Sequence, residues 1–493
     1  MAVIAGFMVP HPPMIVPEVG RGSEAAIEET TKAYEKVAER IAELAPDTIV
    51  ISSPHTIMYA DYHHISPGRE AKGDFSGFGA GQVRMQISYD ERFVDALCVE
   101  AMQQDLDAGT MGEKDKALDH GTMVPLYFIL QKYTDFRLVR IGLSGLSLEH
   151  QYRVGMAIQK VARNLGKKTV YIASGDLSHK LKEDGPYGFD PAGPEYDDRI
   201  MDVMGRGAFD ELFAFDEHFL EKCAECGHRS FVMMAGAFDR QKVSIEKLSH
   251  QDVTGVGYGI CCFESAGDEP DEDRAFLDIW EQKEKQRRDA ARSKEDLYVR
   301  LARASLESHI RYGQTISAKE ALEELVEMMQ KEGQPSETDQ SNNRECEPAV
   351  QEKALLNRKA GAFVSLHKQG QLRGCIGTIA PVRDCLAQEI IENAISAAVH
   401  DNRFLPVTAD ELELLEYSVD VLSETEPIES EEQLDVRRYG IIVTKGYKRG
   451  LLLPNLDGVD TVAEQLSIAK RKAGLSPNEK GCSLERFEVV RHY

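Results

Sequence analysis

Short apolar runs alternate with amphipathic stretches along residues 2–264 of the chain. The runs AVIAGFMV, DTIVISS, RLVRIGLSG and TVYIASG have the length and composition of buried strands, whereas residues 23–45 have the spacing of an amphipathic helix. GVGYGICCFE, at 255–264, predicts one more buried strand. This alternation is typical of an α/β fold in which helices flank a sheet.

The pattern changes in the second half of the chain. Residues 274–310 are charged and rich in alanine and predict a helix, whereas the polar stretch 331–353 predicts a loop. The remaining apolar runs predict a smaller α+β domain with these elements in order: a hairpin in AGAFVSLHKQGQLRGCIGTIA, a helix over 383–399, a strand in YSVDVLS, a hairpin in YGIIVTKGYKRGLLLP and a helix over 459–474.

A chain of 493 residues is longer than one hydrophobic core usually supports. The acidic stretch SAGDEPDEDR follows the last strand predicted in the first half. We therefore predict an α/β domain over 1–266, an acidic and helical linker over 267–296, and a smaller α+β domain over 297–493.

Composition narrows the class of protein and its partners. Hydrophobic residues make up 42% and charged residues 29% of the chain, as in ordinary globular proteins. The formal net charge of −25 repels phosphate backbones and acidic membrane surfaces, so we expect neither nucleic acid nor membrane as a partner. The start MAVIAGFMVPHPP resembles neither a signal peptide nor a membrane span. Nine cysteines without regular spacing then indicate reduced thiols in a cytoplasmic protein.

Three histidines closely follow predicted strands: His11 after AVIAGFMVP, His55 after DTIVISSP and His179 after TVYIASGDLS. Ligands of open α/β sheets bind outside the carboxyl ends of the strands, so these side chains are expected to converge on one site. His120, in LDHGTMVPLYF, lies in a fourth loop just before an apolar run. Each histidine taken singly is compatible with an ordinary loop residue, and only their shared position predicts a site.

The segment EKCAECGHRSF adds Cys223, Glu225, Cys226 and His228 to the candidates. Its C-x-x-C pair suits zinc or redox chemistry, but a structural zinc needs four ligands and the chain has no second such pair. In the other interpretation, Glu225 completes two histidines into a facial triad, which leaves three positions on Fe(II) for a substrate and O₂.

Five motifs follow one another along the chain: VPHPP, SSPH, DHGTMVPL, SGDLSH and AECGHRS. In this order they resemble the class III (LigB-like) extradiol ring-cleavage dioxygenases, and especially their Memo-like branch. The resemblance covers about residues 1–264 and implies that His11, His55 and Glu225 bind the metal. In the Memo-like branch a cysteine can be the third ligand, so Cys226 or Cys223 is the alternative. A carboxylate suits Fe(II) and O₂ chemistry better than a thiolate, which favours Glu225.

The resemblance also implies a reaction on a small aromatic or diol substrate. A catechol-like diol loses a proton to His179, binds Fe(II) through both oxygens and reacts with O₂ bound beside it, while His120 lies near the substrate or the oxygen. Histidine suits this proton transfer because its ordinary pKa of about 6.5 lies near neutral pH.

From about residue 295 to 493 the sequence resembles the AMMECR family, with GAFVSLHKQGQLRGCIGTI as its signature. Arg373 and Cys375 lie beside glycines of LRGCIG, where another backbone or a ligand can approach closely. Cys375 is either a nucleophile or ligand next to Arg373, or a buried thiol beside packing glycines. The resemblance assigns no activity to this domain. Proteins that pair the two domains are associated with radical S-adenosylmethionine enzymes, which implies such an enzyme as a partner.

Two other hypotheses stay open at this point. Zn²⁺ held by the same His, His and Glu residues would activate water for hydrolysis. Alternatively, the first domain is a Memo-like binding module for a peptide or small molecule, and the AMMECR-type domain docks a partner enzyme. The identity of the bound metal separates the oxygenase from the hydrolase.

Overall fold

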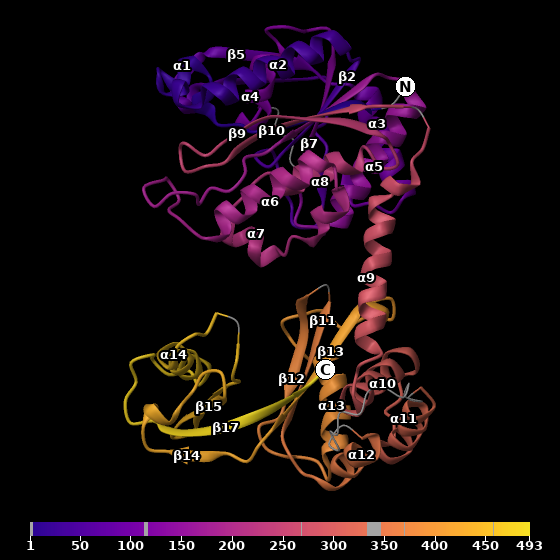
Figure 1. The fold of residues 1–493 in the computed structure, drawn as a ribbon, viewed down its shortest axis with the longest axis vertical. Coiled ribbons are helices and arrows are strands. Elements are labelled where there is room, and N and C mark those ends of the chain that lie inside the picture. Colours follow the sequence, from indigo (N-terminus) through magenta and orange to yellow (C-terminus); the bar gives the residue numbers. More distant parts are fainter. Residues whose placement is uncertain (1–2, 113–116, 268, 333–346, 369, 457) are drawn as a thin grey trace. The chain divides into compact units, whose positions relative to one another are not determined.

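The computed structural model describes residues 3–112, 117–267, 269–332, 347–368, 370–456 and 458–493. The chain divides into two compact units, Met1–Lys283 and Glu284–Tyr493, which are described separately (Figure 1). An α/β fold followed by a smaller α+β fold confirms the predicted fold class. The bounds predicted for the two domains and the linker stay a prediction.

The first unit is built on a six-stranded sheet with the order β7-β2-β8-β1-β10-β9. Its strands are β1 (Val3–Val9), β2 (Thr48–Ser53), β7 (Arg137–Gly142), β8 (Thr169–Ser174), β9 (Val243–Gln251) and β10 (Tyr258–Ser265). β7, β2, β8 and β1 are parallel neighbours, whereas β10 and β9 extend the sheet antiparallel. β2 and β8 are buried along their whole length, which explains their continuous apolar sequences.

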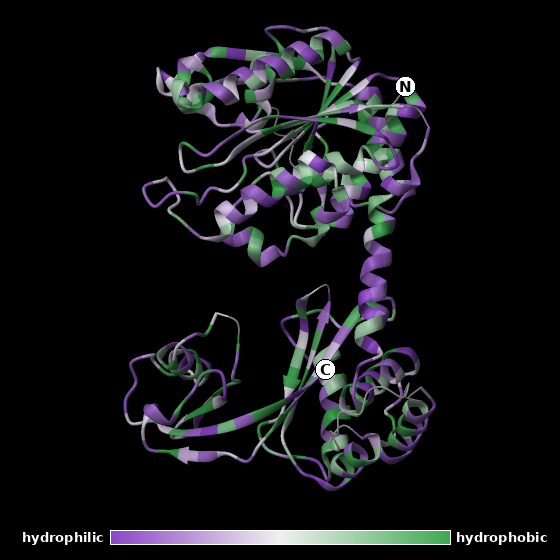
Figure 2. Ribbon diagram, in the orientation of Figure 1, coloured by the Kyte–Doolittle hydropathy of each residue, from purple (hydrophilic) through white to green (hydrophobic). Residues whose placement is uncertain are grey.

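Helices cover both faces of this sheet, and each face carries its own hydrophobic cluster (Figure 1). One face packs against α2 (Glu28–Leu44) and α4 (His120–Ile129). The other packs against α3 (Glu91–Gln103), α5 (Leu148–Leu165), α6 (Ala192–Arg206) and α8 (His228–Gly236). Figure 2 shows hydrophobic residues concentrated in the central strands. The smaller elements are α1 (Pro17–Gly20), α7 (Glu217–Cys223), the hairpin β4 (Glu70–Phe75) with β5 (Ala80–Ser88), and β3 (His63–His64) paired with β6 (Ala108–Gly109).

The second unit contains an antiparallel sheet with the order β12-β11-β13-β17-β15-β16, to which β14 adds by pairing with β17. Its strands are β11 (Ala362–Lys368), β12 (Gln371–Gly377), β13 (Leu415–Leu422), β14 (Glu426–Ile428), β15 (Tyr439–Lys445), β16 (Lys448–Leu452) and β17 (Ser483–His492). The helices are α10 (Leu297–Tyr312), α11 (Ala318–Glu332), α12 (Pro348–Asn357), α13 (Leu386–Val399) and α14 (Val462–Lys472). α10 to α13 pack at the β11–β13 end, and α14 packs on β15 and β16.

Two sequence-based expectations for local structure are wrong. The helix expected over 274–310 is two helices, α9 (Phe276–Arg292) and α10, because the Asp296 side chain accepts hydrogen bonds from the backbone N–H groups of Tyr298 and Val299 and starts a new helix. The loop expected over 331–353 includes residues of α11 and α12, and its residues 333–346 lie outside those that the structure describes.

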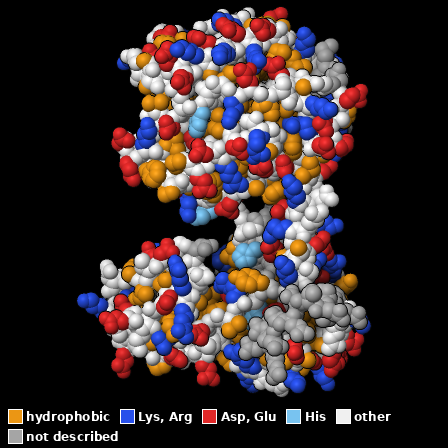
Figure 3. Space-filling model, viewed as in Figure 1, with side chains coloured by type: hydrophobic (Ala, Val, Ile, Leu, Met, Phe, Trp, Pro, Cys, Tyr) orange, Lys and Arg blue, Asp and Glu red, His pale blue; other side chains and the backbone are white. Residues whose placement is uncertain are grey.

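Neither the surface charges nor the cysteines indicate a particular function. In the described ranges, no helix combines the length and the apolar character needed to cross a membrane. The eight cysteines of these ranges are free of disulfide bonds. Acidic and basic side chains are interspersed over the visible face of each unit (Figure 3), so the negative net charge is spread rather than concentrated on that face.

Candidate metal centre

The carboxyl ends of neighbouring parallel strands position two of the predicted histidines. β1, β8 and β2 are adjacent in the sheet, so the residues that follow them meet at one edge. His11 follows β1 and His55 follows β2. Their Nε2 atoms lie 2.9 Å apart, and the His11 Nδ1 lies 3.0 Å from the Ser174 hydroxyl at the end of β8. The structure therefore brings these two histidines together.

His120 joins them from the first turn of α4. Its ring centroid lies 4.0 Å from that of His55 and 5.4 Å from that of His11. Asp119 caps α4 by accepting hydrogen bonds from the backbone N–H of Thr122 and from the hydroxyl of Ser53. The cap therefore ties the start of α4 to the end of β2 and fixes His120 beside His55.

Cys226 reaches the same edge from the loop between α7 and α8. Its Sγ lies 3.6 Å from the His11 Nε2. This approach depends on two glycines, because a Cβ on Gly175 would lie only 2.1 Å from the Cα of Gly227. Because neither glycine has a side chain, the backbone after β8 can contact the backbone before α8. This contact positions Cys226 beside His11.

Two groups of side chains among the described residues have the geometry to hold a metal ion: His11, His55 and Cys226, and Asp176, His179 and Cys226. Within each group the ligand atoms all lie within 4.8 Å of one another. Imidazole nitrogen and thiolate sulfur suit iron, copper and zinc, whereas Mg²⁺ and Ca²⁺ prefer oxygen ligands. The donor atoms therefore fit a transition metal.

Glu225 belongs to neither group. Its carboxylate accepts a hydrogen bond from the backbone N–H of His228, at the start of α8. Burial raises the pKa of this carboxyl to about 7. The structure thus places Glu225 as a cap of α8, next in sequence to a cysteine that does lie beside the histidines.

His179 and Asp176 extend the centre beyond the end of β8. The Asp176 Oδ1 accepts a hydrogen bond of 2.7 Å from the backbone N–H of His11, and its other oxygen lies 4.0 Å from the His11 Nε2. The His179 Nε2 is buried, with no hydrogen-bond partner in the described part of the chain, and its ring stacks on Tyr187 at 5.0 Å. A buried ring nitrogen without a partner is costly, and this one belongs to a residue grouped with Asp176 and Cys226 as possible metal ligands.

Burial keeps the histidines of this centre neutral. It lowers the pKa of His11 well below its ordinary value, with further lowering by His55, His120 and His179. It lowers the pKa of His120 and of His179 to about 4. Neutral imidazoles present lone pairs, which is the form that binds a metal or accepts a proton.

Sequence reasoning missed Asp176 and Tyr187. Asp176 lies inside the motif SGDLSH, so the motif contained the signal, but only its histidine was given a role. Burial raises the pKa of Asp176 to about 7, which sets it apart from ordinary surface carboxylates. Tyr187 lies in a stretch whose sequence indicates no site, and only its stacking on His179 reveals it.

Arg373 and Cys375 both lie on β12 of the second unit. The Arg373 guanidinium donates two hydrogen bonds to Glu411, at 2.9 and 3.0 Å, while the Cys375 Sγ accepts one of 3.2 Å from the Ser365 hydroxyl. Arg373 is thus engaged with a carboxylate and makes no hydrogen bond to the thiol within the described residues.

An α/β sheet with a cluster of histidines at the carboxyl ends of its parallel strands defines the class of the first unit. Residues 5–261 match the family described as the catalytic LigB subunit of aromatic ring-opening dioxygenase, and the chain belongs to this family. Residues 299–492 match the AMMECR1 family. The LigB-like and AMMECR resemblances drawn from the sequence are confirmed, whereas the Memo-like branch stays a prediction.

Three relatives illustrate these matches. Protein CA_C1420 of Clostridium acetobutylicum is 39% identical over 505 residues, which cover 100% of this chain and 99% of that protein. The 2-aminophenol 1,6-dioxygenase beta subunit of a Pseudomonas species is 27% identical over 285 residues, or 52% of this chain and 92% of the subunit. A Thermotoga maritima protein is 43% identical over 196 residues, or 40% of this chain and 96% of that protein.

Proposed function

We propose that the first unit is a non-haem Fe(II)-dependent oxygenase of the extradiol ring-cleavage type, acting on a catechol-like or related small aromatic molecule and O₂. The observation that carries this proposal is the meeting of His11, His55 and Cys226 at the carboxyl ends of parallel strands in a LigB-family chain. The similarity to a 2-aminophenol 1,6-dioxygenase beta subunit supports an aromatic substrate with two neighbouring polar substituents.

His11, His55 and Cys226 are the residues that would hold the iron. Glu225, the third ligand expected from the sequence, is the alternative to Cys226. When bound, Fe(II) would act as a Lewis acid and as a template for a diol and O₂. The Asp176 carboxylate supports this arrangement because it holds the backbone N–H of His11.

His179 and His120 would handle protons and position the substrate. The unpaired Nε2 of His179 accepts a proton from a phenolic hydroxyl, since burial keeps this imidazole neutral at pH 7. His120 has Phe78 at 5.4 Å and His55 at 4.0 Å between ring centroids. These rings provide flat apolar surface against which an aromatic substrate can lie.

The test is the metal content of anaerobically purified protein, compared with that of His55→Ala, Cys226→Ala and Glu225→Ala variants, followed by O₂ uptake with catechol. We expect about one iron per chain, lost in His55→Ala and Cys226→Ala. O₂ uptake should depend on the iron. Protein that holds no metal, or metal that all three variants retain, would overturn the oxygenase and favour the Memo-like binding module.

The cysteine supports a second candidate function. Two imidazoles and a thiolate also suit Zn²⁺, which would activate water for hydrolysis of a small substrate. Zinc in the purified protein, with no O₂ uptake in the presence of added Fe(II), would favour this hydrolase. The radical S-adenosylmethionine partner and the cytoplasmic location stay predictions, and the AMMECR-type domain has no assigned activity.

A further inference from the structure

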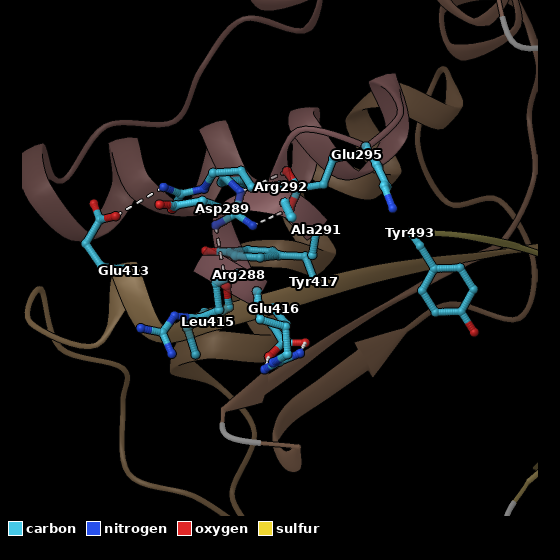
Figure 4. Close-up of a pocket in the computed structure, with 14 residues that line it drawn as sticks. Arg288, Asp289, Ala291, Arg292, Glu295, Glu413, Leu415, Glu416, Tyr417 and Tyr493 are labelled. Carbon is cyan, nitrogen blue, oxygen red and sulfur yellow. Dashed lines mark hydrogen bonds and ion pairs between the residues drawn. The ribbon is translucent and has the colours of Figure 1, made fainter. Parts of the chain in front are cut away.

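A pocket of about 470 Å³ lies in the second unit (Figure 4). The end of α9, the turn into α10 and the start of β13 line it. Neither Arg373 nor Cys375 belongs to its lining. Its volume is within the range of pockets that take small molecules, so it can hold a compact ligand.

The lining of this pocket is rich in arginine. Five of its side chains are cationic and four are acidic, and three of the acids are used in pairs: Arg287 with Glu416, Arg292 with Glu413, and Arg303 with Glu295. These pairs build the walls, and two further carboxylates, Glu284 and Glu307, also neutralise arginines of the lining.

Arg288 is a largely buried cation of the lining without a close counter-charge. Its side chain is only 19% exposed. Its one ion pair among the described residues is with Glu284 at 4.0 Å, and Arg287 binds the same carboxylate at 3.1 Å. A guanidinium has five N–H donors in a planar fork, and one carboxylate at 4.0 Å leaves most of them open to another acceptor. An anion in the pocket would accept hydrogen bonds from these donors.

Tyr417 provides a second unpaired group in the pocket. Its side chain is 5% exposed, and its buried hydroxyl has no hydrogen-bond partner within the described residues. Burial raises the pKa of Tyr417, so the hydroxyl stays protonated and can donate. The Arg303 guanidinium lies 4.2 Å from the ring centroid, and Figure 4 shows the ring lying across the pocket. The lining thus combines an unpaired hydroxyl donor with a guanidinium whose donors are largely open.

We propose that this pocket binds a small organic carboxylate, which pairs with the Arg288 guanidinium and accepts a hydrogen bond from the Tyr417 hydroxyl. A guanidinium matches a carboxylate through two parallel hydrogen bonds. The carboxylates around the arginines of the lining repel a dianion more strongly than a monoanion, so a carboxylate fits better than a phosphate ester. The binding site belongs to the second unit alone and does not require the metal centre proposed for the first.

Ligand-observed NMR of benzoate in the presence of the full chain tests the proposal. Benzamide is the neutral probe of the same shape, and phenyl phosphate is the dianionic probe. All measurements use the His55→Ala background, so that benzoate bound at the first unit's metal centre is not counted. We expect benzoate to bind with about millimolar affinity, as suits a ligand of its size, and benzamide and phenyl phosphate to bind more weakly.

Variants of the pocket identify the site. Arg288→Gln should weaken benzoate binding about tenfold or more, and Tyr417→Phe should weaken it by a smaller factor. Arg437→Gln is the matched control because Arg437 is an exposed arginine outside the pocket, and it should leave binding unchanged. If Arg288→Gln does not fold, Arg288→Lys keeps the charge but loses the paired hydrogen bonds, and should still weaken binding.

Three results would overturn the proposal. Equal binding of benzoate and benzamide would show that the charge is not recognised. Unchanged benzoate binding in the Arg288 variant would place the site elsewhere. Tighter binding of phenyl phosphate than of benzoate would replace the carboxylate by a phosphate ester.

Discussion

At the strand ends of the first unit, burial lowers the pKa of His120 and of His179 to about 4. In the second unit, hydrogen bonds from Arg373, and then from Lys368, lower the pKa of Glu411 to about 2. The shift in the first unit keeps the histidines neutral, and the shift in the second unit keeps the carboxylate charged. A neutral histidine presents a lone pair to a ligand, while a charged carboxylate between two cations is already satisfied. The same kind of pKa shift thus indicates a site in one unit and an ion pair that supports the fold in the other.

The two units also differ in whether the polar group at the candidate position already has hydrogen-bond partners. His179 lies beside Asp176 and Cys226 and has an unpaired Nε2, so a metal or a substrate can bind there. Arg373 has no such need, because Glu411 and the carbonyl oxygens of Leu405 and Pro406 occupy its guanidinium. A group next to possible metal ligands that has no partner of its own is therefore a better candidate for binding than a charged group whose partners are all in place.

The largest expected effect concerns the third metal ligand. Cys226→Ala removes a ligand atom beside His11, so we expect iron affinity to fall by at least about tenfold to a hundredfold, as measured by titration with a competing chelator. Glu225→Gln should retain the metal, because this residue acts as a cap of α8.

The matched pair of substitutions decides between the two ligand assignments. Loss of iron in Glu225→Gln together with retention in Cys226→Ala would restore the carboxylate ligand expected from the sequence. Far-ultraviolet circular dichroism of both variants controls for unfolding, since both residues lie in the same loop before α8.

A second prediction tests the backbone approach that carries Cys226 to the strand ends. Gly175→Ala adds a Cβ that would lie 2.1 Å from the Cα of Gly227, and backbone atoms cannot move aside cheaply. We expect a loss of about 1–3 kcal/mol in the free energy of unfolding of the first unit, together with weaker metal binding. Gly77→Ala is the control, since its Cβ would meet open space. Equal stability of the two variants would contradict the packing described here.

Sequence reasoning located the centre because its main signal is local. His11 and His55 each follow an apolar run by two residues, and the position of strand ends alone predicted that they meet. The position of Cys226 beside His11 could not be derived in this way, because it depends on the contact between Gly175 and Gly227, which are far apart in the sequence. The residues adjacent to each glycine in the sequence do not predict such a contact.

The same limit applies to the fold of the second unit. The hairpin β11–β12 was predicted because its two strands are joined by a short turn. β17 was not predicted, although it is central to the sheet, because its neighbours β13, β14 and β15 all lie well before it in the chain. Strand pairing over long sequence distances leaves little local signal beyond alternation of apolar and polar residues.

The smallest expected effect tests the structural side of the comparison. Glu411 has a pKa of about 2 in the folded protein against an ordinary value of about 4.5, so its ionised form stabilises the fold. That contribution is fully present above pH 4.5 and is lost as the pH falls towards 2. Glu411→Gln should therefore cost about 1–2 kcal/mol in the free energy of unfolding at pH 7, and less at pH 3. Urea unfolding at both pH values measures this difference, with the exposed Glu424→Gln as the control. A cost that stays the same at both pH values would mean that Glu411 acts through packing rather than charge, and the contrast between the two units would then lose its electrostatic basis.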